Sequence, residues 1–156
     1  MRFSLAAMLA TALFALGISA CGGGDDKLSK DELARQADTI CREFDKKIKA
    51  VPQPAGAANE RTAADYYDQT RPIIADSIEE FETLEPADSV QRDWETFIAK
   101  QKEAARLLDE FLAQVKARDR TAQRTLAQIN AAIVASSTAA KRIGADACAT
   151  SSSAAS

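Results

Sequence analysis

Three cysteines, Cys21, Cys41 and Cys148, are the residues whose type and position point most directly to chemistry. The chain contains no histidine, so no imidazole is present to act as a general base, a proton shuttle or a metal ligand. This excludes serine–histidine and cysteine–histidine catalysis and histidine-based metal centres. Glycine-rich phosphate-binding loops and nucleophile elbows are also missing from the sequence. We therefore expect a protein that is not an enzyme and that uses no metal or other cofactor.

Cys21 follows a segment typical of an export signal. Residues 1–20 carry a single charge, Arg2, which precedes an apolar run that ends at Ile18. This run is too short for a comfortable membrane span. Ile18-Ser19-Ala20-Cys21 resembles the lipobox of bacterial lipoproteins, which implies cleavage before Cys21 and attachment of lipid to its sulfur. A plain secreted protein or an uncleaved N-terminal anchor is the alternative.

The residues after Cys21 predict a short tether and one folded domain. Three glycines and two aspartates follow the cysteine directly, a composition typical of a flexible linker. We expect a signal peptide at 1–20, a lipidated cysteine and tether at 21–28, a helical bundle at 29–148 and a disordered tail at 149–156. The lipid on Cys21 would place the domain at the outer face of the cytoplasmic membrane. The net charge of −3 gives no excess of positive charge for a nucleic acid partner.

Cys41 and Cys148 form an even pair once Cys21 is assigned to lipid. In an oxidising compartment such a pair predicts a structural disulfide. Two free, buried thiols are the alternative. A redox-active pair is disfavoured, because the sequence has no Cys-x-x-Cys spacing to lower a thiol pKa.

The remaining sequence predicts four amphipathic helices. Apolar residues recur every three or four positions in segments near 30–50, 60–85, 88–117 and 121–143. Pro72 should kink the second helix or restart it at that point, and Gly144 is placed to end the fourth. Short connections favour an all-α, antiparallel up-down four-helix bundle with three long helices and a thinner, alanine-rich fourth. The main competitor is a three-helix bundle with the fourth segment loosely docked.

This arrangement sets the expected places of the disulfide and of a basic patch. The first helix and the chain after the fourth meet at the membrane-proximal end, where we expect the Cys41–Cys148 bond. At the distal end we expect a basic patch for an envelope protein or an anionic polymer. Its candidate residues are Lys46, Lys47, Lys49, Arg118, Arg120 and Arg124. The charge preferences of helix ends explain the same residues equally well.

Two functions remain open at this point. The first is a non-catalytic, lipid-anchored interaction or scaffold module of the cell envelope. The alternative is a carrier or sensor that binds a small apolar ligand between helices, favoured by the small residues Ala132, Ser136 and Ala140 facing larger helices. A continuous internal cavity would favour the ligand carrier. A solid core with an exposed apolar patch would favour the interaction module.

Taken together, several features resemble uncharacterised actinobacterial lipoproteins, and the resemblance spans nearly the whole chain. They are the lipobox Cys21, the Gly-Asp tether, Leu28-Ser29-Lys30 opening a helix, Gln36-Ala37-Asp38-Thr39-Ile40-Cys41, the Leu84-Glu85-Pro86 break before a tryptophan-bearing helix, and a cysteine near the C-terminus. The resemblance implies a surface-anchored helical protein with its two mature cysteines bonded. It brings no established activity with it.

Overall fold

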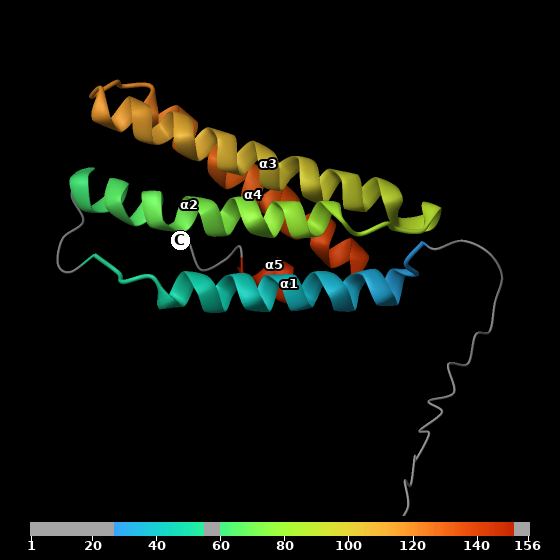
Figure 1. The fold of residues 1–156 in the computed structure, drawn as a ribbon. Coiled ribbons are helices and arrows are strands. Elements are labelled where there is room, and N and C mark those ends of the chain that lie inside the picture. Colours follow the sequence, from blue (N-terminus) through green and yellow to red (C-terminus); the bar gives the residue numbers. More distant parts are fainter. Residues whose placement is uncertain (1–26, 55–59, 152–156) are drawn as a thin grey trace, which may run out of the picture.

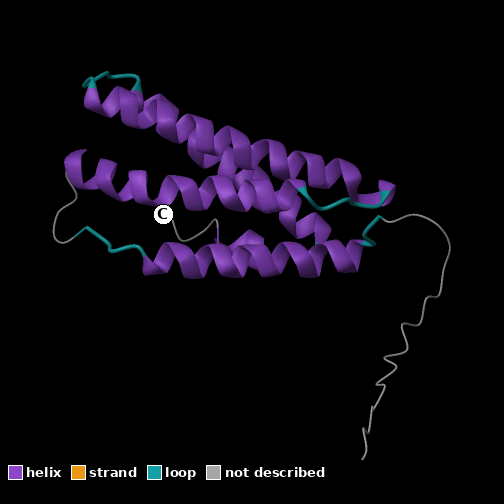
Figure 2. Cartoon of the chain, viewed as in Figure 1, coloured by secondary structure: helices purple, strands orange, loops and turns teal. Residues whose placement is uncertain are grey.

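The computed structural model describes residues 27–54 and 60–151, and every regular element in those residues is a helix. The helices are α1 (Lys30–Ala50), α2 (Glu60–Glu82), α3 (Asp88–Lys116), α4 (Ala122–Ile143) and α5 (Asp146–Ser151). The four long helices run alternately in opposite directions (Figure 1), and Figure 2 shows that the described connections between them are short. The all-α, antiparallel bundle predicted from the sequence is therefore confirmed.

The short helix α5 bridges the first and last long helices of the bundle, and the sequence did not predict it. Neighbouring long helices pack in the order α1, α2, α3, α4, whereas α1 and α4 touch each other over only a small area. Helix α5 packs against both and so connects them. Ala149 is 4% exposed, so the expected disordered tail at 149–156 is corrected for its first three residues, which belong to α5. Burial of the apolar face of α5 explains why these residues are ordered.

The folded domain begins within the segment that was expected to be tether. The N–H of Leu28 donates to the carbonyl of Glu85 at 2.7 Å, and the carbonyl of Leu28 accepts from Ala87 at 2.8 Å. Ser29 and Glu32 then form a capping box at the start of α1. The expected tether at 21–28 is therefore too long, because Leu28 is hydrogen-bonded to the loop between α2 and α3.

Pro72 and Gly144 were both expected to affect a helix, and of the two only Gly144 ends one. Helix α2 continues through Pro72 without restarting. Pro72 and Asp68 are both exposed, so the carbonyl that loses its helical hydrogen bond lies on the solvent side of the helix. Gly144 ends α4 as predicted, with φ of 93° and its N–H directed to the carbonyls of Ala140 and Lys141.

The core is built from aromatic side chains on α2 and α3 and from small side chains on α4. Phe81, Trp94 and Phe97 contact one another with ring centroids 5.0 to 5.8 Å apart. Helix α4 buries Ala132, Ser136, Ala139 and Ala140, which lets it approach its neighbours closely. The apolar periodicity of the fourth predicted helix places Leu126 on its inward face, but Leu126 is 37% exposed, because Thr125 and Ile129 occupy the inward positions of that turn.

Candidate ligand-binding cavity

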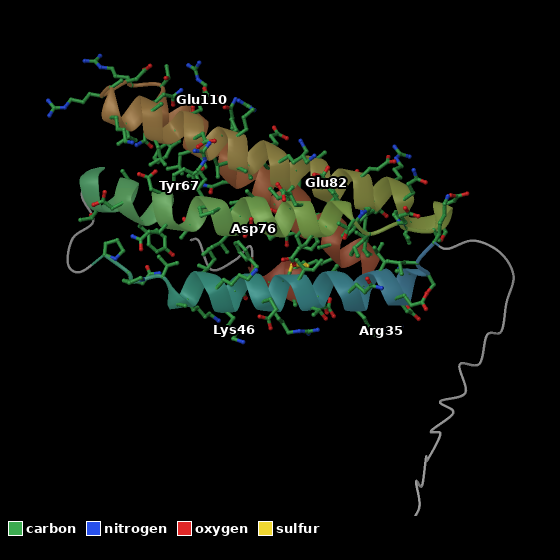
Figure 3. The ribbon with its side chains drawn as sticks, viewed as in Figure 1. Arg35, Lys46, Tyr67, Asp76, Glu82 and Glu110 are labelled. Carbon is green, nitrogen blue, oxygen red and sulfur yellow. A yellow bond between two sulfur atoms is a disulfide. The ribbon has the colours of Figure 1, made fainter. Side chains whose placement is uncertain are left out.

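Cys41 and Cys148 form the predicted disulfide, with their Cα atoms 5.2 Å apart. Both residues are buried, at 5% and 1% exposed. The bond joins α5 to the middle of α1 (Figure 3), so its expected place at the membrane-proximal end is corrected. The reason is the chain reversal after Gly144, which carries α5 back along α1. The disulfide therefore lies inside the bundle.

A cavity of about 230 Å³ lies beside this disulfide, between the helices of the bundle and partly open to solvent. Each of the described helices contributes to its lining. The lining residues are Cys41 and Phe44 of α1, Ile74, Ser77 and Phe81 of α2, Gln101, Ala104, Ala105 and Leu108 of α3, Ile129 and Ile133 of α4, and Cys148 of α5. The cavity is therefore a property of the whole fold.

The cavity exists because small side chains meet where two helices stand apart. Protein interiors rarely contain voids much larger than a water molecule. Here Ala104 and Ala105 of α3 line the cavity, and α1 and α4 make little direct contact with each other. For comparison, an engineered apolar cavity of about 150 Å³ binds benzene. The space is therefore large enough for a small organic molecule.

Polar chemistry in the cavity is confined to two described side chains. The hydroxyl of Ser77 donates to the carbonyl of Ile74 at 2.8 Å, which leaves the lone pairs of its oxygen available as acceptors. Gln101 is half-buried, and its carboxamide makes no hydrogen bond with any residue in the described part of the chain. None of the described lining residues is ionisable, because the two cysteines are bonded to each other and do not titrate. The geometry suits a ligand that is mainly apolar.

A second cluster lies on the outside of the bundle, between α2 and α3. Tyr67 donates from its hydroxyl to Asp109 Oδ1 at 3.1 Å, and Arg71 Nε lies 3.3 Å from the same oxygen. Tyr67 lies between the two helices (Figure 3). Burial, helped by the hydrogen bond to Asp109, raises the pKa of Tyr67 to about 12. A phenol held neutral in this way is poorly suited to act as a base, and the cluster ties α2 to α3.

The structure divides the predicted basic patch into two groups. Lys46, Lys47 and Lys49 lie at the end of α1, whereas Arg118, Arg120 and Arg124 lie at the α3–α4 turn and the start of α4. Lys46 Nζ lies 3.8 Å from Glu43, and Lys47 Nζ lies 3.6 Å from Glu80. The two groups share the distal end of the bundle but stand at its opposite edges in the view of Figure 1, with the start of α2 between them. The patch thus draws on two separate elements at the same end of the bundle, and its role in binding a partner stays a prediction.

Further observations concern the predicted lipid anchor, membrane-spanning segments and metal sites. Cys21 and the signal peptide at 1–20 fall outside the described residues. Among the helices at 30–50, 60–82, 88–116, 122–143 and 146–151, none combines the length and apolar character needed to cross a bilayer. The described side chains include no group of three or more carboxylates or thiols arranged to hold a metal ion.

The sequence contained a signal for Gln101 but not for the cavity. Gln101 falls on the inward stripe of its helix, between Phe97 and Ala104, and a polar residue in that register can mark a binding site. The small residues Ala132, Ser136 and Ala140, which suggested a ligand site on α4, are buried but do not line the cavity. Ala104 and Ala105 on the facing helix do so instead.

The fold and this site define a class of protein: a helical bundle with a buried disulfide and a partly open, mainly apolar cavity between its helices. No protein-family model, curated protein or solved structure matches the chain.

Proposed function

We propose that this protein is a non-catalytic binding protein that holds a small, mainly apolar ligand between its helices. The observation that carries the proposal is the cavity of about 230 Å³ lined by every described helix. Ligand pockets in proteins are concave, mostly apolar and supplied with a few placed polar groups. The cavity has each of these properties, with Ser77 and Gln101 as the polar groups.

The proposed place of action is the outer face of the cytoplasmic membrane. The export signal and the lipobox cysteine Cys21 support attachment through lipid, since two or more acyl chains anchor a protein stably whereas one is marginal. The Cys41–Cys148 disulfide supports an oxidising compartment, where such bonds persist. A carrier or sensor at this position would meet apolar molecules that leave or enter the bilayer.

The structural details favour ligand binding over an interaction or scaffold module. Large exposed hydrophobic side chains in the described part of the chain are limited to Leu126 and Val134, both on α4, and single exposed apolar residues are normal on soluble domains. The basic residues predicted to contact an envelope partner lie in two groups, and Lys46 and Lys47 already pair with carboxylates. The cavity therefore supports ligand binding more strongly than these surface residues support a protein interaction.

Calorimetric titration with propylbenzene tests the proposal. The protein is the mature chain 21–156 carrying Cys21→Ser, so that neither an acyl chain nor detergent competes for the cavity. Nine carbon atoms buried at typical ligand efficiencies give a Kd on the order of 0.1 mM. Ala104→Leu fills part of the cavity and should weaken binding at least tenfold.

Ala113→Leu is the matched control, because Ala113 is an exposed residue of the same helix that does not line the cavity. It should leave propylbenzene binding unchanged. Filling the cavity should also raise the free energy of unfolding by about 1 kcal/mol in Ala104→Leu, whereas an exposed substitution changes it by less than about 0.5 kcal/mol. Equal binding by the two variants would rule the cavity out as the binding site.

A further inference from the structure

We propose that the ligand is a neutral molecule with one hydrogen-bonding group, a hydroxyl or a carbonyl, held by Gln101. This inference rests on the proposed function and adds the chemical class of the ligand. Three properties of the cavity carry it: its volume, the absence of charge among its described lining residues, and the carboxamide of Gln101, which has no hydrogen-bond partner among the described residues.

The volume sets the size of the apolar body. An apolar cavity of about 150 Å³ accommodates benzene, which has six carbon atoms. The same packing in about 230 Å³ corresponds to roughly nine non-hydrogen atoms. A single substituted ring or a short branched chain is of this size. A full-length membrane acyl chain is too large to be enclosed.

The lining determines the charge of the ligand. The described lining residues include no lysine, arginine, aspartate or glutamate, so no ion pair can form with a buried carboxylate or ammonium group. Transfer of an unpaired ion from water to such surroundings is strongly unfavourable. A ligand that buries its polar end against these residues must therefore be neutral.

Gln101 determines the polar group. Its carboxamide offers two N–H donors and a carbonyl acceptor, none of which is paired with another described side chain or backbone group. A ligand hydroxyl can donate to the carbonyl and accept from an N–H, and a ligand carbonyl can accept from an N–H. Ser77 presents a further acceptor from α2, because its own proton is used on Ile74. The two polar residues thus favour one neutral hydrogen-bonding group in an otherwise apolar molecule.

Three related molecules separate the contributions of shape, hydrogen bonding and charge. Propylbenzene has the apolar body alone, 3-phenylpropan-1-ol adds a hydroxyl, and 3-phenylpropanoate adds a negative charge. Each is titrated calorimetrically into the mature chain 21–156 with Cys21→Ser, alone and combined with Gln101→Leu. Gln128→Leu is the control variant, because Gln128 is an exposed glutamine on α4 outside the cavity lining.

The comparison is made across variants for each molecule, because dehydration of the hydroxyl is then the same on both sides. Gln101→Leu should weaken binding of the alcohol about three- to tenfold, the range for one neutral hydrogen bond, and should not weaken binding of propylbenzene. Gln128→Leu should change neither. The carboxylate should bind at least tenfold more weakly than the alcohol.

The outcomes separate this inference from the proposed function. If propylbenzene binds and Ala104→Leu blocks it, but Gln101→Leu affects the alcohol and the hydrocarbon equally, the cavity binds ligands by shape alone and the inference is overturned. Binding of the carboxylate as tight as that of the alcohol overturns it too, since the polar end would then lie in solvent. If neither the hydrocarbon nor the alcohol binds, the proposed function itself fails and this inference fails with it.

Discussion

Tyr67 and Gln101 show two different surroundings for polar side chains in the bundle. Tyr67 is 7% exposed, yet its hydroxyl reaches Asp109, which Arg71 also contacts. A buried hydroxyl without a partner would cost free energy, and this arrangement avoids that cost while linking α2 to α3. Gln101 differs, because its carboxamide lines the cavity without a partner in the described chain. We therefore assign a structural role to Tyr67 and propose a ligand-binding role for Gln101.

The raised pKa of Tyr67 predicts a pH dependence of stability. The folded protein holds the phenolic proton up to about pH 12, whereas an unfolded tyrosine releases it near pH 10. The free energy of unfolding should therefore fall as the pH rises from about 10 to 12. Absorbance titration of the phenolate in a Tyr66→Phe background isolates Tyr67, since the chain has two tyrosines.

Asp109→Asn is the informative variant for this titration. It removes the negative charge beside the phenol and should lower the pKa of Tyr67 while leaving it above 10, because burial, the larger cause, remains. An unchanged pKa in this variant would show that Asp109 does not contact the hydroxyl in solution. A pKa near 10 in the parent protein would show that Tyr67 is exposed.

At the scale of elements, α1 and α5 depend on each other through the disulfide. Helix α5 spans Asp146–Ser151, which is too short to be stable alone in water. Packing against α1 and α4 and the bond from Cys148 to Cys41 hold it in place. The hydrogen bond from the N–H of Ala147 to Asp38 Oδ1, at 2.8 Å, adds a contact between the same two helices.

Removing the disulfide should therefore loosen α5 before the other helices. The double variant Cys41→Ala, Cys148→Ala opens a loop of 107 residues and should lower the free energy of unfolding by about 2 to 5 kcal/mol, measured by urea denaturation. Amide exchange in native conditions should speed up most in α5. Cys21→Ser alone serves as the control. A loss below about 1 kcal/mol, or uniform exchange along the chain, would show that α5 is held by packing alone.

Sequence patterns predicted the long helices well and the short one not at all. The capping box at Ser29 and the glycine at 144 mark helix ends by local chemistry that depends on no distant contact. Helix α5 shows no periodicity because it has fewer than two turns. The inward face of α4 was predicted incorrectly at Leu126, because tertiary packing turns Thr125 toward the core instead.

At the scale of the whole molecule, the main property of the bundle is that its helices do not fill all of the space between them. Helices α1 and α4 make little direct contact, and α5 bridges them. A void remains beside this bridge, between Phe44, Leu108 and Ile133. Sequence reasoning left a ligand carrier open as an alternative but did not locate the cavity. A void depends on the volumes of side chains from five separate segments, and no local pattern records that sum.

Location of a bound apolar molecule tests the central claim most directly. We would crystallise residues 21–156 with Cys21→Ser, soak the crystals with iodobenzene and find the iodine from its anomalous scattering. The account predicts a peak inside the bundle, in van der Waals contact with residues such as Phe44, Leu108 and Ile133. An empty cavity, or a peak only on the exposed face of α4 near Val134, would contradict it.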